Sequence, residues 1–267
     1  MLFCIGTGEP GAPAPAEGGG SVLRLLSNQN FNPTRLIVVS FGAIILLGTF
    51  LLHLPISARD GQFTPWLTCL FTATSATCVT GLVLVDSALH WTPFGQGVIL
   101  AMIQLGGLGF VSLISLIPLL LRRRIGLSQR LAIASAFNLN GMSGVVRVVR
   151  HALMGTFLLE GCGAILLATR FVPLFGWGRG LWYSIFHSVS AFCNAGFDLM
   201  GEHTGAFSSL AGFREDPVVL GTIGCLIVLG GLGFFVWEDC LEHRSWRRLS
   251  FYSRMVLAVT GALILGG

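Results

Sequence analysis

The sequence predicts an all-α membrane protein built from parallel repeats, each with two spanning helices and a short re-entrant segment between them. Three observations predict this fold class: long uncharged apolar runs, short polar segments that cannot span, and an internal repeat. Of the 267 residues, 53% are hydrophobic and only 10% are charged, whereas a soluble domain usually has about 25% charged residues. The mean hydropathy of +0.79 points the same way.

Several apolar runs are long enough to cross the hydrocarbon core, which takes about 20 residues. Val98 to Leu121 and Val218 to Trp237 carry no charge, and Leu36 to Leu54 carries none apart from His53. These runs predict spanning helices over residues 35–54, 94–121, 150–172 and 217–237, with a further helix starting near residue 253.

An internal repeat orders these helices. The twelve residues from Phe71 to Leu82 align with Phe186 to Phe197 at an offset of 115, and Phe, Ser, Ala, Cys and Gly coincide. The six residues Leu-Gly-Gly-Leu-Gly-Phe that start at Leu105 recur letter for letter from Leu229. Two spans return the chain to its starting side, so successive units share one orientation. The sequence therefore predicts two complete repeats and the start of a third.

The predicted domain boundaries follow from these repeats. Residues 1–34 are rich in Gly, Pro and Ala at their start and are expected to form a disordered cytoplasmic tail. The first repeat covers residues 35–121, a cytoplasmic linker 122–149, the second repeat 150–238, a second linker 239–252, and the start of the third repeat 253–267. Because residue 267 falls inside that helix, we expect a chain truncated from a longer protein.

All sixteen basic residues are arginines, and most of them lie in the two predicted linkers or before the first span. The positive-inside rule makes that side cytoplasmic, and with it the N-terminus. The charge is split among short loops, so we expect no nucleic-acid partner. The seven cysteines are odd in number and form no C-x-x-C pair, which predicts free thiols with neither a disulfide framework nor a metal site.

Each repeat holds a short, moderately polar helix followed by an extended stretch with one glycine. These pore segments cover about residues 65–82 and 180–197. Glycine permits backbone angles that turn a carbonyl inward, rings of carbonyls can replace the hydration shell of K⁺, and the C-terminal end of a helix favours a cation. Neither stretch holds a carboxylate, which disfavours a filter made of carboxylate rings.

These residues resemble the Trk/Ktr/HKT superfamily of potassium transporters, which look like four fused two-helix potassium-channel subunits. The resemblance runs from about Arg35 to Gly267 and rests on T-S-A-T-C-V-T-G-L, S-A-F-C-N-A-G-F-D and the paired L-G-G-L-G-F motif. It implies a K⁺ filter made by two sets of residues, namely Cys78, Val79, Thr80 and Gly81 in the first repeat and Cys193, Asn194, Ala195 and Gly196 in the second.

In that filter, carbonyls of Val79, Thr80, Asn194 and Ala195 would face the ion, and the two cysteines would lie just below. The resemblance further implies uptake of K⁺ down its electrochemical gradient across a bacterial cell membrane, with Na⁺ or H⁺ as alternative coupling ions. It also implies a cytosolic nucleotide-binding regulatory subunit and a homodimer of the full-length protein. The chain departs from the family by ending before the third and fourth filters and the gating loop.

Other interpretations remain beside this one. An incomplete membrane scaffold without transport of its own is the main alternative, while an intramembrane enzyme is disfavoured because the spans lack G-x-S-x-G, H-E-x-x-H and paired aspartates. The repeated glycine motif favours close helix packing over a nucleotide loop. Glu160 makes either a structural contact or a contribution to the ion path. Asp198 either attracts cations or caps a loop, and His187 favours hydrogen-bonded packing.

Overall fold

The computed structural model describes residues 33–108, 145–243 and 245–266. Within these ranges the regular structure is helical, and an isolated antiparallel bridge joins Ala58 to Trp91. The all-α class predicted from the sequence is confirmed. Most of the predicted disordered tail, the end of the second span and most of the first linker lie outside the described residues, and α2 begins at Pro33, inside the predicted tail.

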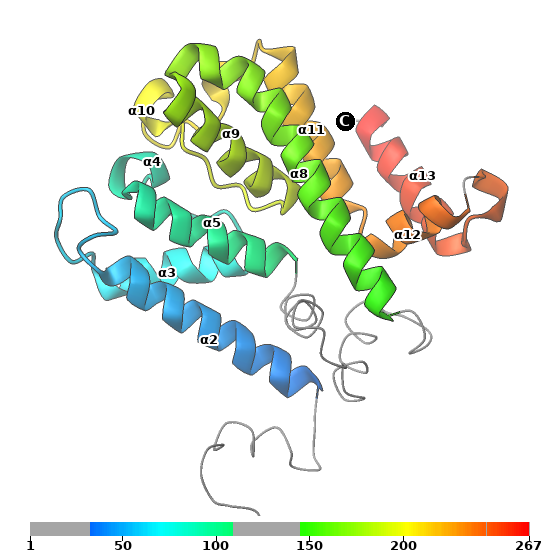
Figure 1. Cartoon of the computed structure of the whole chain (residues 1–267), viewed down its shortest axis with the longest axis horizontal. Coiled ribbons are helices and arrows are strands. Elements are labelled where there is room, and N and C mark those ends of the chain that lie inside the picture. Colours follow the sequence, from blue (N-terminus) through cyan, green and yellow to red (C-terminus); the bar gives the residue numbers. More distant parts are fainter. Residues whose placement is uncertain (1–32, 109–144, 244, 267) are drawn as a thin grey trace, which may run out of the picture. The chain divides into compact units, whose positions relative to one another are not determined.

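The helices of the described residues are α2 Pro33–His53, α3 Trp66–Thr77, α4 Ser87–His90, α5 Pro93–Gly107, α8 Val145–Phe175, α9 Trp177–Phe192, α10 Gly201–Thr204, α11 Pro217–Gly231, α12 Phe234–Glu242 and α13 Phe251–Gly266, with short 3₁₀ turns at Ala211–Phe213 and Trp246–Arg248. Helices α2, α3, α8, α9 and α13 lie where the apolar runs and the pore segments predict helices. Helix α3 packs against α2 and α5, and α9 packs against α8 and α11 (Figure 1). Helix α5 also contacts α9, which links the two groups.

Two of these helices begin at the same local signal. The Thr92 hydroxyl caps α5 and the Asp216 carboxylate caps α11, and each cap is followed by a proline at the first helical position. A side-chain oxygen at the cap satisfies a free backbone N–H of the first turn. Proline fits next because its missing N–H would have no helical partner there and its φ is already helical. The sequence alone therefore sets both starting points.

One helix in the described part of the chain, Arg150–Phe175, is long and apolar enough to cross a membrane by itself. The pair Pro217–Gly231 and Phe234–Glu242 makes a second span if it is counted as one, but its halves meet at a bend of 90°. The sequence predicts an uninterrupted helix over residues 217–237, and the structure differs. The cause is Gly233, whose φ of 83° is incompatible with a right-handed helix and costs glycine no steric strain.

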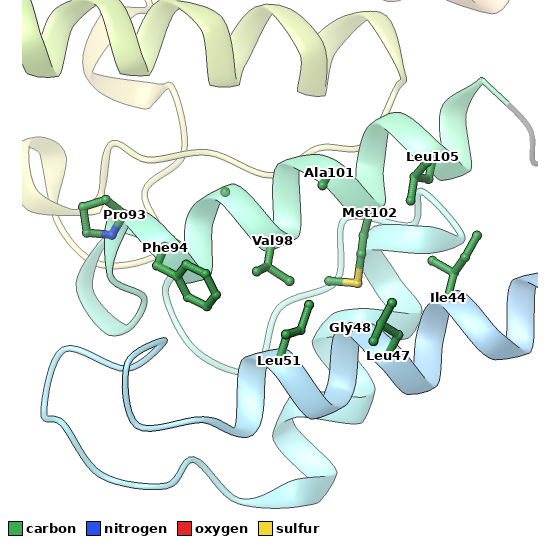
Figure 2. Close-up of a pocket in the computed structure, with 11 residues that line it drawn as sticks. Ile44, Leu47, Gly48, Leu51, Pro93, Phe94, Val98, Ala101, Met102 and Leu105 are labelled. Carbon is green, nitrogen blue, oxygen red and sulfur yellow. The ribbon is translucent and has the colours of Figure 1, made fainter. Parts of the chain in front are cut away.

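An apolar cavity of about 470 Å³ lies between α2 and α5. Figure 2 shows Leu51 from α2 and Val98 and Met102 from α5 directed toward it. A Cβ added at Gly48 would collide with Met102 Sδ. The missing side chain at Gly48 therefore leaves room for the Met102 side chain between the two helices.

Candidate functional site

The first loop segment, residues 78–81, begins in a tight turn at the end of α3. The Thr80 N–H donates to the Ser75 carbonyl at 3.0 Å, and the hydroxyls of the same two residues are joined at 2.9 Å. The Val79 N–H donates to the Ala76 carbonyl at 3.3 Å. This bond pattern is a Schellman motif, which closes a helix around one left-handed residue. That residue is Val79, with φ 58°, and a β-branched side chain at positive φ is strained.

The second loop segment, residues 193–196, begins in the same turn at the end of α9. The Ala195 N–H donates to the Ser190 carbonyl at 2.7 Å. The Asn194 N–H donates to the Ala191 carbonyl at 3.0 Å, and Asn194 again has φ 58°. Asparagine accepts the left-handed conformation more easily than valine does. Both helices therefore end in one backbone geometry although the central side chains are unrelated.

The two loop segments approach each other at their glycines. Gly81 and Gly196 have φ values of 71° and 74°, in the left-handed region. A Cβ added at Gly81 would lie 2.6 Å from the Ala195 carbonyl oxygen and 3.3 Å from Gly196 Cα. The backbone conformation and the close approach of the second segment therefore both require glycine at position 81.

The structure places all eight predicted filter residues in these two loop segments. They differ in accessibility within the described part of the chain: Ala195 is buried, Val79, Gly81 and Cys193 are half-buried, and Cys78, Thr80, Asn194 and Gly196 are exposed.

The end of α5 touches the base of both loop segments. A Cβ added at Gly106 would collide with the Thr77 carbonyl, at the end of α3. A Cβ added at the next residue, Gly107, would collide with Cys193 Sγ in the second segment. Glycines at these two positions let one helix pack against the end of α3 and the second loop segment at once, which agrees with the packing role that the repeated glycine motif predicts.

The same motif in α11 has a matching contact. A Cβ added at Gly230 would collide with the Phe192 carbonyl at the end of α9, as Gly106 would with Thr77. Gly106 of α5 therefore packs against the last carbonyl of α3, and Gly230 of α11 packs against the last carbonyl of α9.

Polar contacts join the described residues 33–108 to the described residues 145–243, and sequence reasoning missed all of them as pairs. They are Gln104 Nε2 to Glu160 Oε1 at 3.0 Å, Trp182 Nε1 to Gln96 Oε1 at 2.9 Å, the Phe207 N–H to Asp86 Oδ2 at 2.8 Å, and the ion pair of Arg59 with Glu202. The partners are far apart in the chain, so no spacing pattern could reveal them. The one available signal was the charge of Glu160 inside an apolar run.

Two polar residues flanking the second loop segment have structural partners. The His187 Nδ1–H donates to the Tyr183 carbonyl at 2.7 Å, and its Nε2 accepts from the Leu199 N–H at 3.3 Å. Because both ring nitrogens are used, the geometry agrees with the predicted packing role. The Asp198 carboxylate accepts from the Met200 N–H at 3.0 Å. Of its two predicted roles, the loop cap is the one that this contact supports.

Comparison with known proteins gives a consistent result. The family model described as TrkH, cation transport protein, matches residues 26–260. The chain is 38% identical over 247 residues to the potassium/sodium uptake protein NtpJ of Enterococcus hirae, which covers 92% of this chain and 53% of that protein.

Two Ktr system potassium uptake proteins B are similarly related. The one from Bacillus subtilis is 38% identical over 235 residues, which are 88% of this chain and 51% of that protein. The one from Vibrio alginolyticus is 35% identical over 237 residues, 87% and 50% of the two chains. The chain thus spans about half the length of these relatives.

Proposed function

We propose that this chain, which belongs to the TrkH family of cation transport proteins, supplies two of the filter segments of a potassium uptake pore. The observation that carries the proposal is the contact between the two loop segments, each of which leaves its helix through a Schellman turn and passes through a left-handed glycine. The relatives named as uptake proteins favour this role over a scaffold without transport activity.

The proposed architecture is a parallel repeat of helix, pore loop and helix. Helices α2, α3 and α5 form the first unit, α8, α9 and α11 form the second, and α13 begins a third. Equivalent turn hydrogen bonds at an offset of 115 residues support this arrangement. The contacts of Gly106 and Gly230 with the ends of the two short helices, at an offset of 124, support it as well.

In the proposed filter, backbone carbonyls of Val79, Thr80, Asn194 and Ala195 replace the water around K⁺. Carbonyl dipoles held at fixed positions suit a cation that sheds its hydration shell. The C-terminal ends of α3 and α9 add a partial negative charge beside both loop segments. Cys78 and Cys193 lie at the inner start of the segments. No carboxylate is required for this chemistry.

The proposed protein resides in the cell membrane with its N-terminus in the cytoplasm and moves K⁺ inward down its electrochemical gradient. K⁺ uptake coupled to Na⁺ is a candidate beside uncoupled uptake, because one relative is named a potassium/sodium uptake protein. H⁺ is the remaining alternative. We extend the proposal to a cytosolic nucleotide-binding regulatory subunit and a homodimer, since the Ktr relatives are named as lettered parts of a system.

The test is K⁺ or ⁸⁶Rb⁺ uptake, with Na⁺ as competitor, in transport-deficient cells that express the complete reading frame. Gly81→Ser is expected to lower K⁺/Na⁺ discrimination at least about tenfold, because the added side chain strains the turn and displaces the second loop segment. Gly61→Ser is the matched control. Gly61 has φ 67° but has no atom within 4 Å of an added Cβ. Unchanged discrimination in Gly81→Ser would refute the filter assignment.

A further inference from the structure

A partly buried polar cluster lies at the start of the second loop segment. Gln104 from α5 donates its Nε2–H to Glu160 Oε1 of α8 at 3.0 Å, and Cys193 Sγ lies 3.9 Å from the same oxygen. The Glu160 backbone carbonyl accepts from the Ser188 hydroxyl of α9 at 2.6 Å. Glu160 is only 5% exposed. One residue near the middle of the α8 span therefore contacts α5, α9 and the start of the second loop segment.

Within the described residues, the Gln104–Glu160 pair has no polar counterpart at the repeat offsets. At the repeat offsets, Glu160 corresponds to Ile45 in α2, and Gln104 corresponds to Val228 in α11. Both counterparts are apolar, so the pair is not a general feature of these helices. Polar side chains inside a membrane protein are costly unless they are paired. This pair occurs where α5 meets α8 and the second loop segment.

Packing on α5 links the pair to the second loop segment. Gln104 and Gly107 are three residues apart and share one face of the helix. Gly107 touches Cys193, while Gln104 holds Glu160. A displacement of α5 relative to α8 would therefore move the support of Cys193, which is the first residue of the second loop segment.

We propose that Glu160 and Gln104 are positioning residues that fix the second filter segment through their mutual hydrogen bond. The inference rests on the proposed filter function, because it assigns these residues to the same site. Glu160 acts here as a hydrogen-bond acceptor. Its role is to keep α5, α8 and Cys193 in register, and it does not depend on attraction between the carboxylate and the ion.

The test uses K⁺/Na⁺ discrimination in cells that express the complete reading frame. Gln104→Leu removes the donor and is expected to lower discrimination about tenfold, because a buried acceptor loses its partner. Glu160→Gln retains an acceptor oxygen and is expected to stay within about twofold of the wild type. In Gln104→Glu alone, two carboxyl groups lie against each other, and discrimination is expected to fall. Adding Glu160→Gln restores one donor and one acceptor, and discrimination is expected to recover.

The outcomes separate the competing roles. If Glu160→Gln lowers discrimination as far as Gln104→Leu does, the carboxylate acts through its charge and the positioning role is overturned. If the swapped double variant fails to recover discrimination while it keeps wild-type membrane levels and thermal stability, the hydrogen bond is not what matters. Gly81→Ser runs in parallel. An effect of Gly81→Ser with none from Gln104→Leu overturns this inference alone, and no effect of Gly81→Ser overturns the filter itself.

Discussion

Replacing Gly106 with alanine tests whether α5 packs closely against α3, because the added methyl group costs stability only if that contact is formed. In Gly106→Ala the added Cβ would collide with the carbonyl of Thr77 and would lie 2.8 Å from its carbonyl carbon. Ordinary contact begins at 3.4 Å, so the carbon contact alone requires α5 to retreat by 0.6 Å, and the closer carbonyl oxygen requires a larger shift. Thr77 is fully buried at the end of α3 and its backbone has little room to move. Overpacking of this kind costs about 1–3 kcal/mol.

The matched control is Gly97→Ala in the same helix, where an added Cβ has no atom within 4 Å. Alanine there should stabilise α5 by about 0.5–1 kcal/mol. Both substitutions gain helix propensity in the same helix, so the two variants should differ by the packing cost of about 1–3 kcal/mol, or roughly 2–12 °C in Tm. The assay is size-exclusion chromatography of detergent-solubilised protein after heating. If Gly106→Ala is as stable as Gly97→Ala, the close contact of α5 with α3 is not formed and the packing argument fails.

Three further changes test other parts of the fold. Asp86→Ala removes a buried acceptor of three backbone N–H groups and should lower the free energy of unfolding by about 1–3 kcal/mol in the same thermal assay. The control is Asp60→Ala, which removes one exposed hydrogen bond and should cost under about 0.5 kcal/mol. For Asp216, burial raises the pKa, but hydrogen bonds led by that from Arg170 outweigh it and set the pKa below its ordinary value. Its stabilising effect is thus present above the unfolded pKa and is lost as pH falls through the lower folded pKa, so the Tm gap between wild type and Asp216→Asn should close only in acid. Gly233→Ala should cost about 1–2 kcal/mol through its φ of 83° alone, since an added Cβ meets no atom within 4 Å; a wild-type Tm would contradict this.

Local signals allowed much of the fold to be predicted. The starts of α5 and α11 follow from a capping residue and a proline, and the short helices before Gly81 and Gly196 follow from the aligned repeat. Each of these features depends on residues within one or two turns of helix. Propensity and capping act at that range, so they can be read in a linear sequence.

The break in the last predicted span could not be predicted in the same way. Glycine adopts right-handed and left-handed backbone angles alike, so the letters of the motif, which also starts at Leu105, do not by themselves indicate that the chain turns at Gly233. Contacts such as Gln104 with Glu160 pose a related problem. Their partners lie 56 residues apart and depend on how whole helices pack, which no periodicity encodes.

The two loop segments have the same backbone conformation but different side chains. Val79 and Asn194 have the same φ of 58°, although one is apolar and β-branched and the other is a polar amide. The valine retains a strained conformation, which persists only where surrounding bonds impose it. The bonds from Ser75 to Thr80 supply that constraint. If carbonyls bind the ion, the side chain at this position is free to vary while the turn must not, and the pattern of the two loop segments supports that kind of filter.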